Sequence, residues 1–178
     1  LAPHKNLHGL LDGFERAISK AHLGSVHLAL VGDFKGGGFF SNYDSLCDRV
    51  HANPELRDRV HFSGYVSDPD LVALYSSALA VAMPSYSEGF GLPAIEAMAC
   101  AVPVLASDRG ALPEVVGDAG IYFDPFNVES ISAAIIEMVQ NHDLRAQLSA
   151  NALARASGFT WQRAAQLALM HLEAMSQG

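Results

Sequence analysis

Two glutamates enclose a glycine-containing loop in the middle of the chain. Seven residues separate Glu88 from Glu96, and they include Gly89, Gly91 and Pro93. Glycine lets the backbone come close to a ligand or adopt a positive φ. Proline suits the first turn of a helix because its missing N–H is not needed there, and the apolar residues that follow recur at helical spacing. The pattern predicts a loop that opens a helix, with one carboxylate in the loop and the other in the first helical turn.

This loop and helix start would form a site for an anion. Residues 79–83 have the composition of a short, fully buried strand, so the helix would begin just beyond the carboxyl end of a strand. Free N–H groups and the helix dipole both favour a phosphate at such a point. The two carboxylates would repel a phosphate, which indicates that they bind hydroxyl groups instead. A nucleotide-sugar has phosphates in the middle and hydroxyl-rich rings at both ends, and would use all of these parts.

The elements that must hold the loop follow from alternating helical and strand patterns along the chain. Asn6 and Asp68 are the expected N-caps of two helices, and Leu71, Leu74 and Tyr75 are expected to face the core. Short strands separated by helices predict a doubly wound parallel α/β sheet in a single domain. Strands are predicted over residues 26–31, 60–64, 79–83, 103–106 and 120–123. Helices are predicted over residues 6–21, 43–51, 112–116, 127–141, 143–157 and 160–174, and from residue 68.

The glutamate pair around Gly-Phe-Gly-Leu-Pro resembles the donor-site signature of retaining glycosyltransferases with the GT-B fold, of the family-4 or glycosyl transferases group 1 type. The similarity covers essentially the whole chain. The resemblance implies a Rossmann-like sheet that forms the C-terminal, donor-binding half of a longer enzyme. Other segments that resemble landmarks of that family, in the same order, are residues 5–7, 30–32, 62–66, 74–75, 103–104, 112–117 and 159–161.

The resemblance also implies roles for individual residues. Glu96 would accept hydrogen bonds from the two ribose hydroxyls of the donor, since one carboxylate suits a vicinal diol. Glu88 would face the hydroxyls of the transferred sugar, and Lys5 would neutralise the diphosphate. Gly32 and Val66 match positions that line the nucleotide pocket. Backbone N–H groups for the sugar and the diphosphate would come from Gly89, Phe90, Gly91 and Leu92.

Each of these residues has an ordinary structural alternative. Glu96 would complement the helix dipole from the first turn. Glu88 and Lys5 would be solvated side chains, and the glycine loop would be a plain turn. Gly32 and Val66 would only pack at the ends of strands.

Three rival motifs are weaker. Residues 68–70 imitate a metal-binding Asp-x-Asp pattern, but they are better explained as a helix start. Gly32 and Gly37 have the spacing of a phosphate-binding P-loop, yet Gly38 and Phe39 stand where Lys and Ser/Thr are needed. No Gly-x-Gly-x-x-Gly follows the first strand, which argues against a dinucleotide oxidoreductase.

The reaction implied by the resemblance moves a hexose, with mannose favoured, from a GDP- or UDP-sugar to a glycan or lipid-linked acceptor, with retention of configuration. No metal or other cofactor is expected. The N-terminal acceptor domain of the family, its first strand and an arginine that grips the diphosphate have no counterpart in residues 1–178. The domain alone is therefore expected to be inactive. The alternative function is a nucleotide-sugar binding or regulatory module that performs no chemistry.

Composition limits the partners and the compartment. The 178 residues are half apolar and fit one globular domain. A net charge of −8 argues against a nucleic-acid partner. Cys47 and Cys100 are far apart and lack metal-type spacing, which predicts reduced, buried thiols in a cytoplasmic protein. No run is long and apolar enough for a membrane span, and peripheral contact with the inner face of the membrane stays open.

Overall fold

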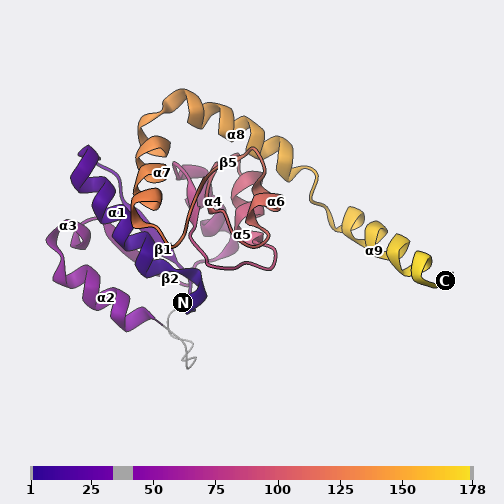
Figure 1. Cartoon of the computed structure of the whole chain (residues 1–178), viewed down its shortest axis with the longest axis horizontal. Coiled ribbons are helices and arrows are strands. Elements are labelled where there is room, and N and C mark those ends of the chain that lie inside the picture. Colours follow the sequence, from indigo (N-terminus) through magenta and orange to yellow (C-terminus); the bar gives the residue numbers. More distant parts are fainter. Residues whose placement is uncertain (1, 34–41, 177–178) are drawn as a thin grey trace.

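The computed structural model describes residues 2–33 and 42–176, which alternate helices and strands (Figure 1). The α/β class predicted from the sequence is confirmed. The strands are β1 (Leu28–Val31), β2 (Val60–Gly64), β3 (Val81–Met83), β4 (Val104–Ser107) and β5 (Gly120–Phe123). The helices are η1 (Pro3–Lys5), α1 (Leu7–Ala21), α2 (Tyr43–Ala52), α3 (Pro54–Arg57), α4 (Asp68–Ser77), α5 (Leu92–Ala99), α6 (Leu112–Val116), α7 (Val128–Gln140), α8 (His142–Ala156) and α9 (Trp161–Ser176).

The five described strands form two parallel sheets instead of the single sheet that was predicted. Strand β1 pairs with β2, and Leu30 lies opposite Phe62. The second sheet has the order β3-β4-β5, with Leu105 of β4 opposite Ala82 and Ile121. All of the pairings are parallel, as predicted. In each sheet the strands therefore end at one common edge, where ligands of open α/β sheets bind.

Two groups of buried side chains hold the layers together. The larger group joins α1 and α7 to residues of both sheets, and includes Leu11, Leu30, Leu105 and Ile131. The smaller group joins α5, α6 and α8, and includes Met98, Leu112 and Ala152. Because the larger group takes residues from both sheets, one core holds the two sheets together.

Strands β1 and β3 are shorter than the sequence predicts, and β3 is also less buried. Strand β1 begins at Leu28 rather than at residue 26, and β3 begins at Val81 rather than at residue 79. Val81 and Ala82 are only half-buried, although Met83 is buried. The prediction of a fully buried strand is wrong because β3 lies at the edge of its sheet, whereas strands inside a parallel sheet are covered on all sides.

Helix α4 differs from its prediction at its start and on its inner face. Its N-cap is Ser67, whose hydroxyl oxygen accepts a hydrogen bond from the Asp70 N–H, so Asp68 is not the cap. None of its residues is fully buried, and Leu74 is exposed. The other two residues expected to face the core are half-buried, namely Leu71 and Tyr75.

The remaining predictions about the chain have mixed outcomes. Cys47 and Cys100 are free thiols as predicted, but both are half-buried rather than buried. The P-loop-like positions Gly37, Gly38 and Phe39 lie outside the described residues.

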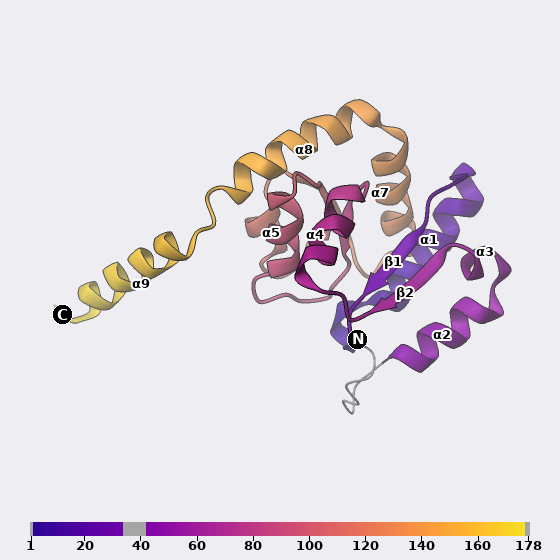
Figure 2. The same cartoon turned by 180° about the vertical axis from the view of Figure 1, so that it is seen from behind.

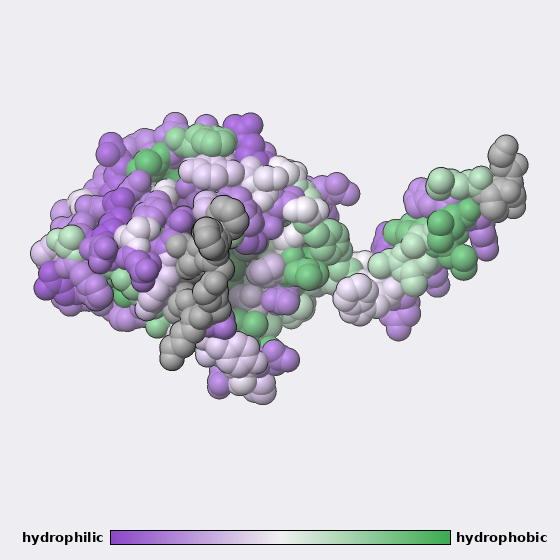
Figure 3. Space-filling model, turned by 90° about the horizontal axis from the view of Figure 1, so that it is seen from below, coloured by the Kyte–Doolittle hydropathy of each residue, from purple (hydrophilic) through white to green (hydrophobic). Residues whose placement is uncertain are grey.

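Helix α9 projects away from the rest of the molecule (Figures 1 and 2). Its large apolar side chains are exposed, and they appear in Figure 3 as a green surface along the helix. Within residues 2–33 and 42–176, no helix combines the length and hydropathy needed to cross a membrane.

Candidate functional site

Glu88 is held by two donors in the loop between β3 and α5. Lys5 Nζ donates to Glu88 Oε1 at 2.6 Å, and Ser85 Oγ donates to the same oxygen at 2.7 Å. The Glu88 side chain is 10% exposed, whereas that of Lys5 is 38% exposed. The structure therefore brings together two predicted site residues that are 83 positions apart in the sequence. It also adds Ser85, which was not predicted, because a single serine before a loop has no distinctive pattern.

These donors keep Glu88 ionised. Burial opposes the charged carboxylate, but the hydrogen bonds from Lys5 and Ser85 and the positive charge nearby outweigh it, so the pKa of Glu88 is lowered. Both described donors bond Oε1. The second carboxylate oxygen, Oε2, accepts no hydrogen bond from any described residue, so a ligand hydroxyl can donate to it.

Asn6 joins the start of α1 to the ends of two strands. Its buried side-chain amide donates to the carbonyl of Pro84 at 3.1 Å and to that of Pro125 at 2.8 Å. The Tyr86 N–H also donates to the His4 carbonyl at 2.9 Å. Asn6 is the N-cap residue of α1 as predicted, but its side chain makes no cap hydrogen bond, and its amide makes these longer-range bonds instead. The segment that carries Lys5 is thereby fixed beside the Glu88 loop.

The glycine loop leaves a row of backbone donors at the start of α5. Gly91 is the N-cap and has a φ of 86°, which favours glycine. Within the described part of the chain, the N–H groups of residues 89–92, which are predicted to bind the sugar and the diphosphate, donate to no acceptor. Free N–H groups at the positive end of a helix favour an anion. The Phe90 ring makes a T-shaped contact with the Phe159 ring, with 6.1 Å between the ring centroids.

A second loop closes against the Glu88 backbone. Ala111 N–H donates to the Glu88 carbonyl at 3.1 Å. Gly110 has a φ of 61°, and a Cβ at this position would lie 2.7 Å from the Glu88 carbonyl oxygen. Only glycine allows so close an approach. The loop between β4 and α6 therefore packs against the backbone of Glu88 and supports it.

Glu96 lies in the second turn of α5, not in the first turn as predicted. Because the dipole effect is confined to the first turn, the alternative that Glu96 merely complements the helix dipole loses its basis. Its carboxylate is exposed and accepts a hydrogen bond from the Tyr75 hydroxyl at 3.1 Å. Burial, followed by the Glu96 charge, raises the pKa of Tyr75 above its ordinary value, so this hydroxyl remains a donor.

The predicted residues of the nucleotide pocket lie at the end of the first sheet. Gly32 follows β1 and Val66 follows β2, and both are half-buried. The Gly32 N–H donates to the Gly64 carbonyl at 3.1 Å, which holds the two strand ends together. Glu88 and Glu96 have separate protein partners, Glu88 toward η1 and Glu96 toward α4.

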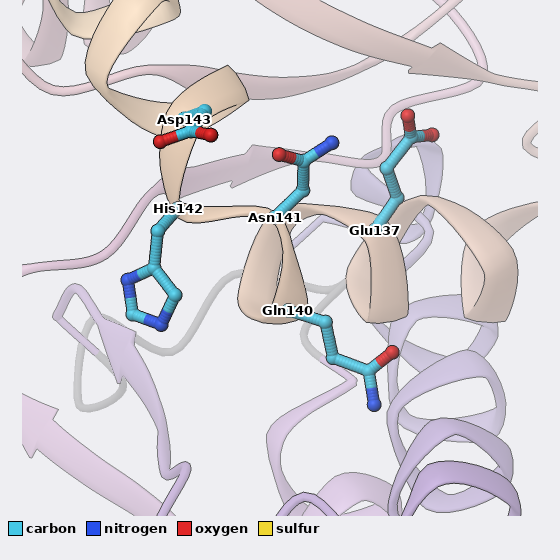
Figure 4. Close-up of a pocket in the computed structure, with 5 residues that line it drawn as sticks. All are labelled: Glu137, Gln140, Asn141, His142 and Asp143. Carbon is cyan, nitrogen blue, oxygen red and sulfur yellow. The ribbon is translucent and has the colours of Figure 1, made fainter.

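A separate hollow at the junction of α7 and α8 carries polar residues but does not have the arrangement of a site. In Figure 4, Glu137 and Asp143 point to one side of the chain, whereas Gln140 and His142 point to the other. The Asn141 side chain accepts from the Leu144 N–H at 3.0 Å and so caps α8. Nowhere in residues 2–33 and 42–176 do three or more His, Cys, Asp or Glu side chains gather as metal ligands would.

Comparison with known proteins assigns this chain to a family. Residues 1–155 match the family described as Glycosyl transferases group 1. The chain belongs to this family. Over 162 residues it is 35% identical to O-antigen chain mannosyltransferase B of Escherichia coli, a match that covers 91% of this chain and 41% of the relative. It is 32% identical over 176 residues to mannosylfructose-phosphate synthase of Agrobacterium fabrum, covering 97% and 38% of the two chains.

Solved structures of glycosyltransferases with the GT-B fold share the architecture of this group 1 chain. Sucrose-phosphate synthase from Thermosynechococcus elongatus superimposes with a TM-score of 0.80 at 28% identity, over 99% of this chain and 44% of the other. Anabaena Alr3699/HepE in complex with UDP-glucose gives a TM-score of 0.82 at 27% identity, over 98% and 46%. The chain thus spans less than half the length of these relatives, and the predicted Rossmann-like, GT-B type of fold is confirmed.

Proposed function

We propose that this chain is the donor-binding half of a retaining glycosyltransferase. The observation that carries the proposal is the ionised Glu88, held by Lys5 and Ser85 beside the free N–H groups at the start of α5. That combination offers a hydroxyl acceptor next to an anion site, as a nucleotide-sugar requires. The donor would be a GDP- or UDP-sugar, and the acceptor a glycan or a lipid-linked glycan.

The proposed chemistry places charge stabilisation at the start of α5. Negative charge develops on the leaving diphosphate, and the N–H groups of residues 89–92 together with Lys5 would stabilise it there. Glu88 would orient the transferred hexose through its hydroxyls, and Glu96 would hold the ribose. The nucleotide would reach Gly32 and Val66. We propose no metal or other cofactor for this step.

The names of the relatives support mannose as the transferred hexose. Both sequence relatives compared above have a mannose unit in their names. HepE is in complex with UDP-glucose in its solved structure, which supports a nucleotide-sugar donor without restricting its base. We place the protein in the cytoplasm, at or near the inner face of the membrane if its acceptor is lipid-linked.

We further propose that residues 1–178 act together with an N-terminal acceptor domain and with one more strand. The open edges of β1 and β3 support the strand. Among the described residues β1 pairs only with β2, and β3 pairs only with β4, whereas proteins usually pair or cover such edges. A parallel strand between them would join the five described strands into one sheet, and would bring the arginine that grips the diphosphate to the same edge.

Replacing Glu96 with alanine tests the donor site. The loss of charge-assisted hydrogen bonds to the ribose should reduce donor affinity by about 1.5–3 kcal/mol, which is about 10- to 150-fold in Kd. The measurement is calorimetric titration of the chain with GDP-mannose and UDP-glucose. Glu137→Ala is the matched control, because Glu137 is an exposed glutamate on α7 away from the loop. Equal donor affinity in the two variants would refute the ribose role.

A transfer assay separates the enzyme from the non-catalytic module. In a protein that also carries the acceptor half, Glu88→Gln should lower the transfer rate much more than it lowers donor affinity. Donor binding without any transfer by the unmodified protein would favour the regulatory module.

A further inference from the structure

Two stacked aromatic rings stand exposed at the carboxyl edge of the second sheet. Tyr86 follows β3 and Phe126 follows β5, and their ring centroids are 4.7 Å apart with an interplanar angle of 17°. Phe126 is 69% exposed and Tyr86 is 39% exposed. A contiguous exposed aromatic surface is uncommon on a soluble domain, and such surfaces often bind a ligand.

Charged groups lie beside the Phe126 ring. The Arg109 guanidinium lies over the Phe126 ring at 5.9 Å. Its Nε donates to Asp108 Oδ1 at 2.9 Å, and its second contact is with Asp124 Oδ1 at 3.6 Å. The same Asp124 oxygen accepts from the Phe126 N–H at 3.0 Å. Asp108, Arg109 and Asp124 form a charged rim beside the rings. Their contacts hold the rim in place before any ligand binds, which reduces the entropy lost on binding.

The rings and their rim adjoin the candidate donor site but share none of its ligand-binding residues. Tyr86 is two positions before Glu88, and its N–H is fixed by the His4 carbonyl. Asn6 holds the carbonyl of Pro125, the residue before Phe126, in the same way. The residues proposed for the nucleotide follow β1 and β2, whereas the rings and rim lie on the ends of β3, β4 and β5. A donor whose hexose lies at Glu88 would therefore leave this surface open beside the reacting sugar.

We propose that Tyr86, Phe126, Asp108, Arg109 and Asp124 form a subsite for a hexopyranose ring of the acceptor glycan, a surface that we call the aromatic platform. A pyranose presents an apolar C–H face that packs on an aromatic ring, and a rim of hydroxyls that pair with carboxylate and guanidinium groups. The inference deepens the proposed function, because it assigns part of acceptor recognition to the donor-binding half.

The charges of the platform favour a neutral sugar over a phosphate. Arg109 is the one cation among these five residues, and both of its ion pairs are with carboxylates. An anion would meet these two carboxylates, whereas a diol can donate to them while accepting from the guanidinium. The nucleotide is thus a poor occupant, and the neutral ring of a glycan is a good one.

Saturation-transfer NMR of the 178-residue chain with methyl α-D-mannopyranoside tests the platform. The sugar ring protons should receive saturation from the unmodified chain, and Phe126→Ala should weaken the apparent affinity about fivefold or more, because the aromatic face is lost. Trp161→Ala is the matched control, since Trp161 is another exposed aromatic residue, on α9. Phe126→Leu keeps an apolar side chain without a ring, and serves as the second variant if the alanine substitution unfolds the chain.

The outcomes separate this inference from the proposed function. Loss of the sugar signal in both Phe126 variants, with the GDP-mannose affinity unchanged, supports the platform. No sugar signal from the unmodified chain, or equal signals in the Phe126 and Trp161 variants, overturns it. A sugar signal that depends on Phe126 in a chain that binds no nucleotide-sugar would retain the platform and refute the donor site.

Discussion

The hydrogen bond between Tyr75 and Glu96 connects α4 to α5 beside the candidate donor site. It occupies one oxygen of a carboxylate that is otherwise exposed, and therefore limits the directions in which Glu96 can point. A carboxylate that is positioned in advance loses less entropy when it binds a diol. Tyr75 is thus a positioning residue for Glu96.

Tyr75→Phe should weaken nucleotide-sugar binding about three- to tenfold, because one hydrogen bond to a charged group is lost. Calorimetric titration with GDP-mannose gives the affinity, and the melting temperature should change little. Tyr122→Phe is the control, since the Tyr122 hydroxyl donates to the Gly117 carbonyl at 2.6 Å, away from the donor loop. Tyr122→Phe should lose stability and keep its donor affinity. If Tyr75→Phe also loses stability and keeps its donor affinity, Tyr75 has a purely structural role.

The lowered pKa of Glu88 predicts a loss of stability in acid. A carboxyl whose pKa is lower in the folded state than its ordinary value of 4.5 stabilises the fold above pH 4.5, and this contribution is lost as the pH falls through the folded value. Urea unfolding measured across this range should therefore give a shallower decline for Glu88→Gln than for the unmodified chain. Lys5→Met should flatten the same part of the curve. An unchanged slope in both variants would mean that the ion pair does not stabilise the fold.

At the scale of elements, the site depends on how closely two loops approach each other. The loop after β4 contacts the loop after β3 through the backbone of Glu88, and Gly110 makes room for that contact. The four free N–H groups of the glycine loop therefore have a rigid support, although the loop itself has few buried side chains.

Gly110→Ala should destabilise the chain by at least about 1–2 kcal/mol, because a side chain at positive φ is strained and its Cβ would collide with the Glu88 backbone. Urea unfolding measures the loss, and nucleotide-sugar affinity should also fall as Glu88 moves. Gly24→Ala is the control, since a Cβ at Gly24 would meet nothing within 4 Å. Similar stabilities for the two variants would contradict the close approach.

At the scale of the whole molecule, the two sheets share one core, and within the described residues β1 and β3 each have an unpaired edge. The Leu28 N–H donates to the Arg59 carbonyl just before β2, and the Val81 N–H donates to the Pro103 carbonyl just before β4. Successive residues of a strand direct their backbone groups to opposite sides. The N–H groups of Ala29 and Ala82 therefore point away from the paired strand.

Amide hydrogen exchange should reveal these edges. In the 178-residue chain the amides of Ala29 and Ala82 should exchange much faster than those of Leu28 and Val81, because only the latter two are bonded to a neighbouring strand. Addition of the proposed strand in a longer protein should slow Ala29 and Ala82 selectively. Strong protection of both amides in the present chain would contradict the open edges.

The local features of the molecule were determined by the sequence alone. Alternating patterns located the strands and most of the helices to within a few residues, although η1 and α3 were not predicted. Pro93 marked the start of α5 correctly, because propensities and caps act over neighbouring residues. The errors follow the same rule. The sequence correctly predicted Asn6 as the N-cap of α1 but not the bonds of its amide to carbonyls far along the chain. The burial of β3 was overestimated because the sequence of a strand does not specify which strands lie beside it.

Only the tertiary structure decided which residues meet at the site. Lys5 and Glu88 are 83 positions apart, Tyr75 and Glu96 are 21 apart, and the rings of the aromatic platform follow different strands. Such contacts arise because the packing of parallel strands brings together the loops and helices around them, whatever their separation in the sequence. The sequence therefore specified the glycine loop and its acids, and the fold supplied the partners that orient them.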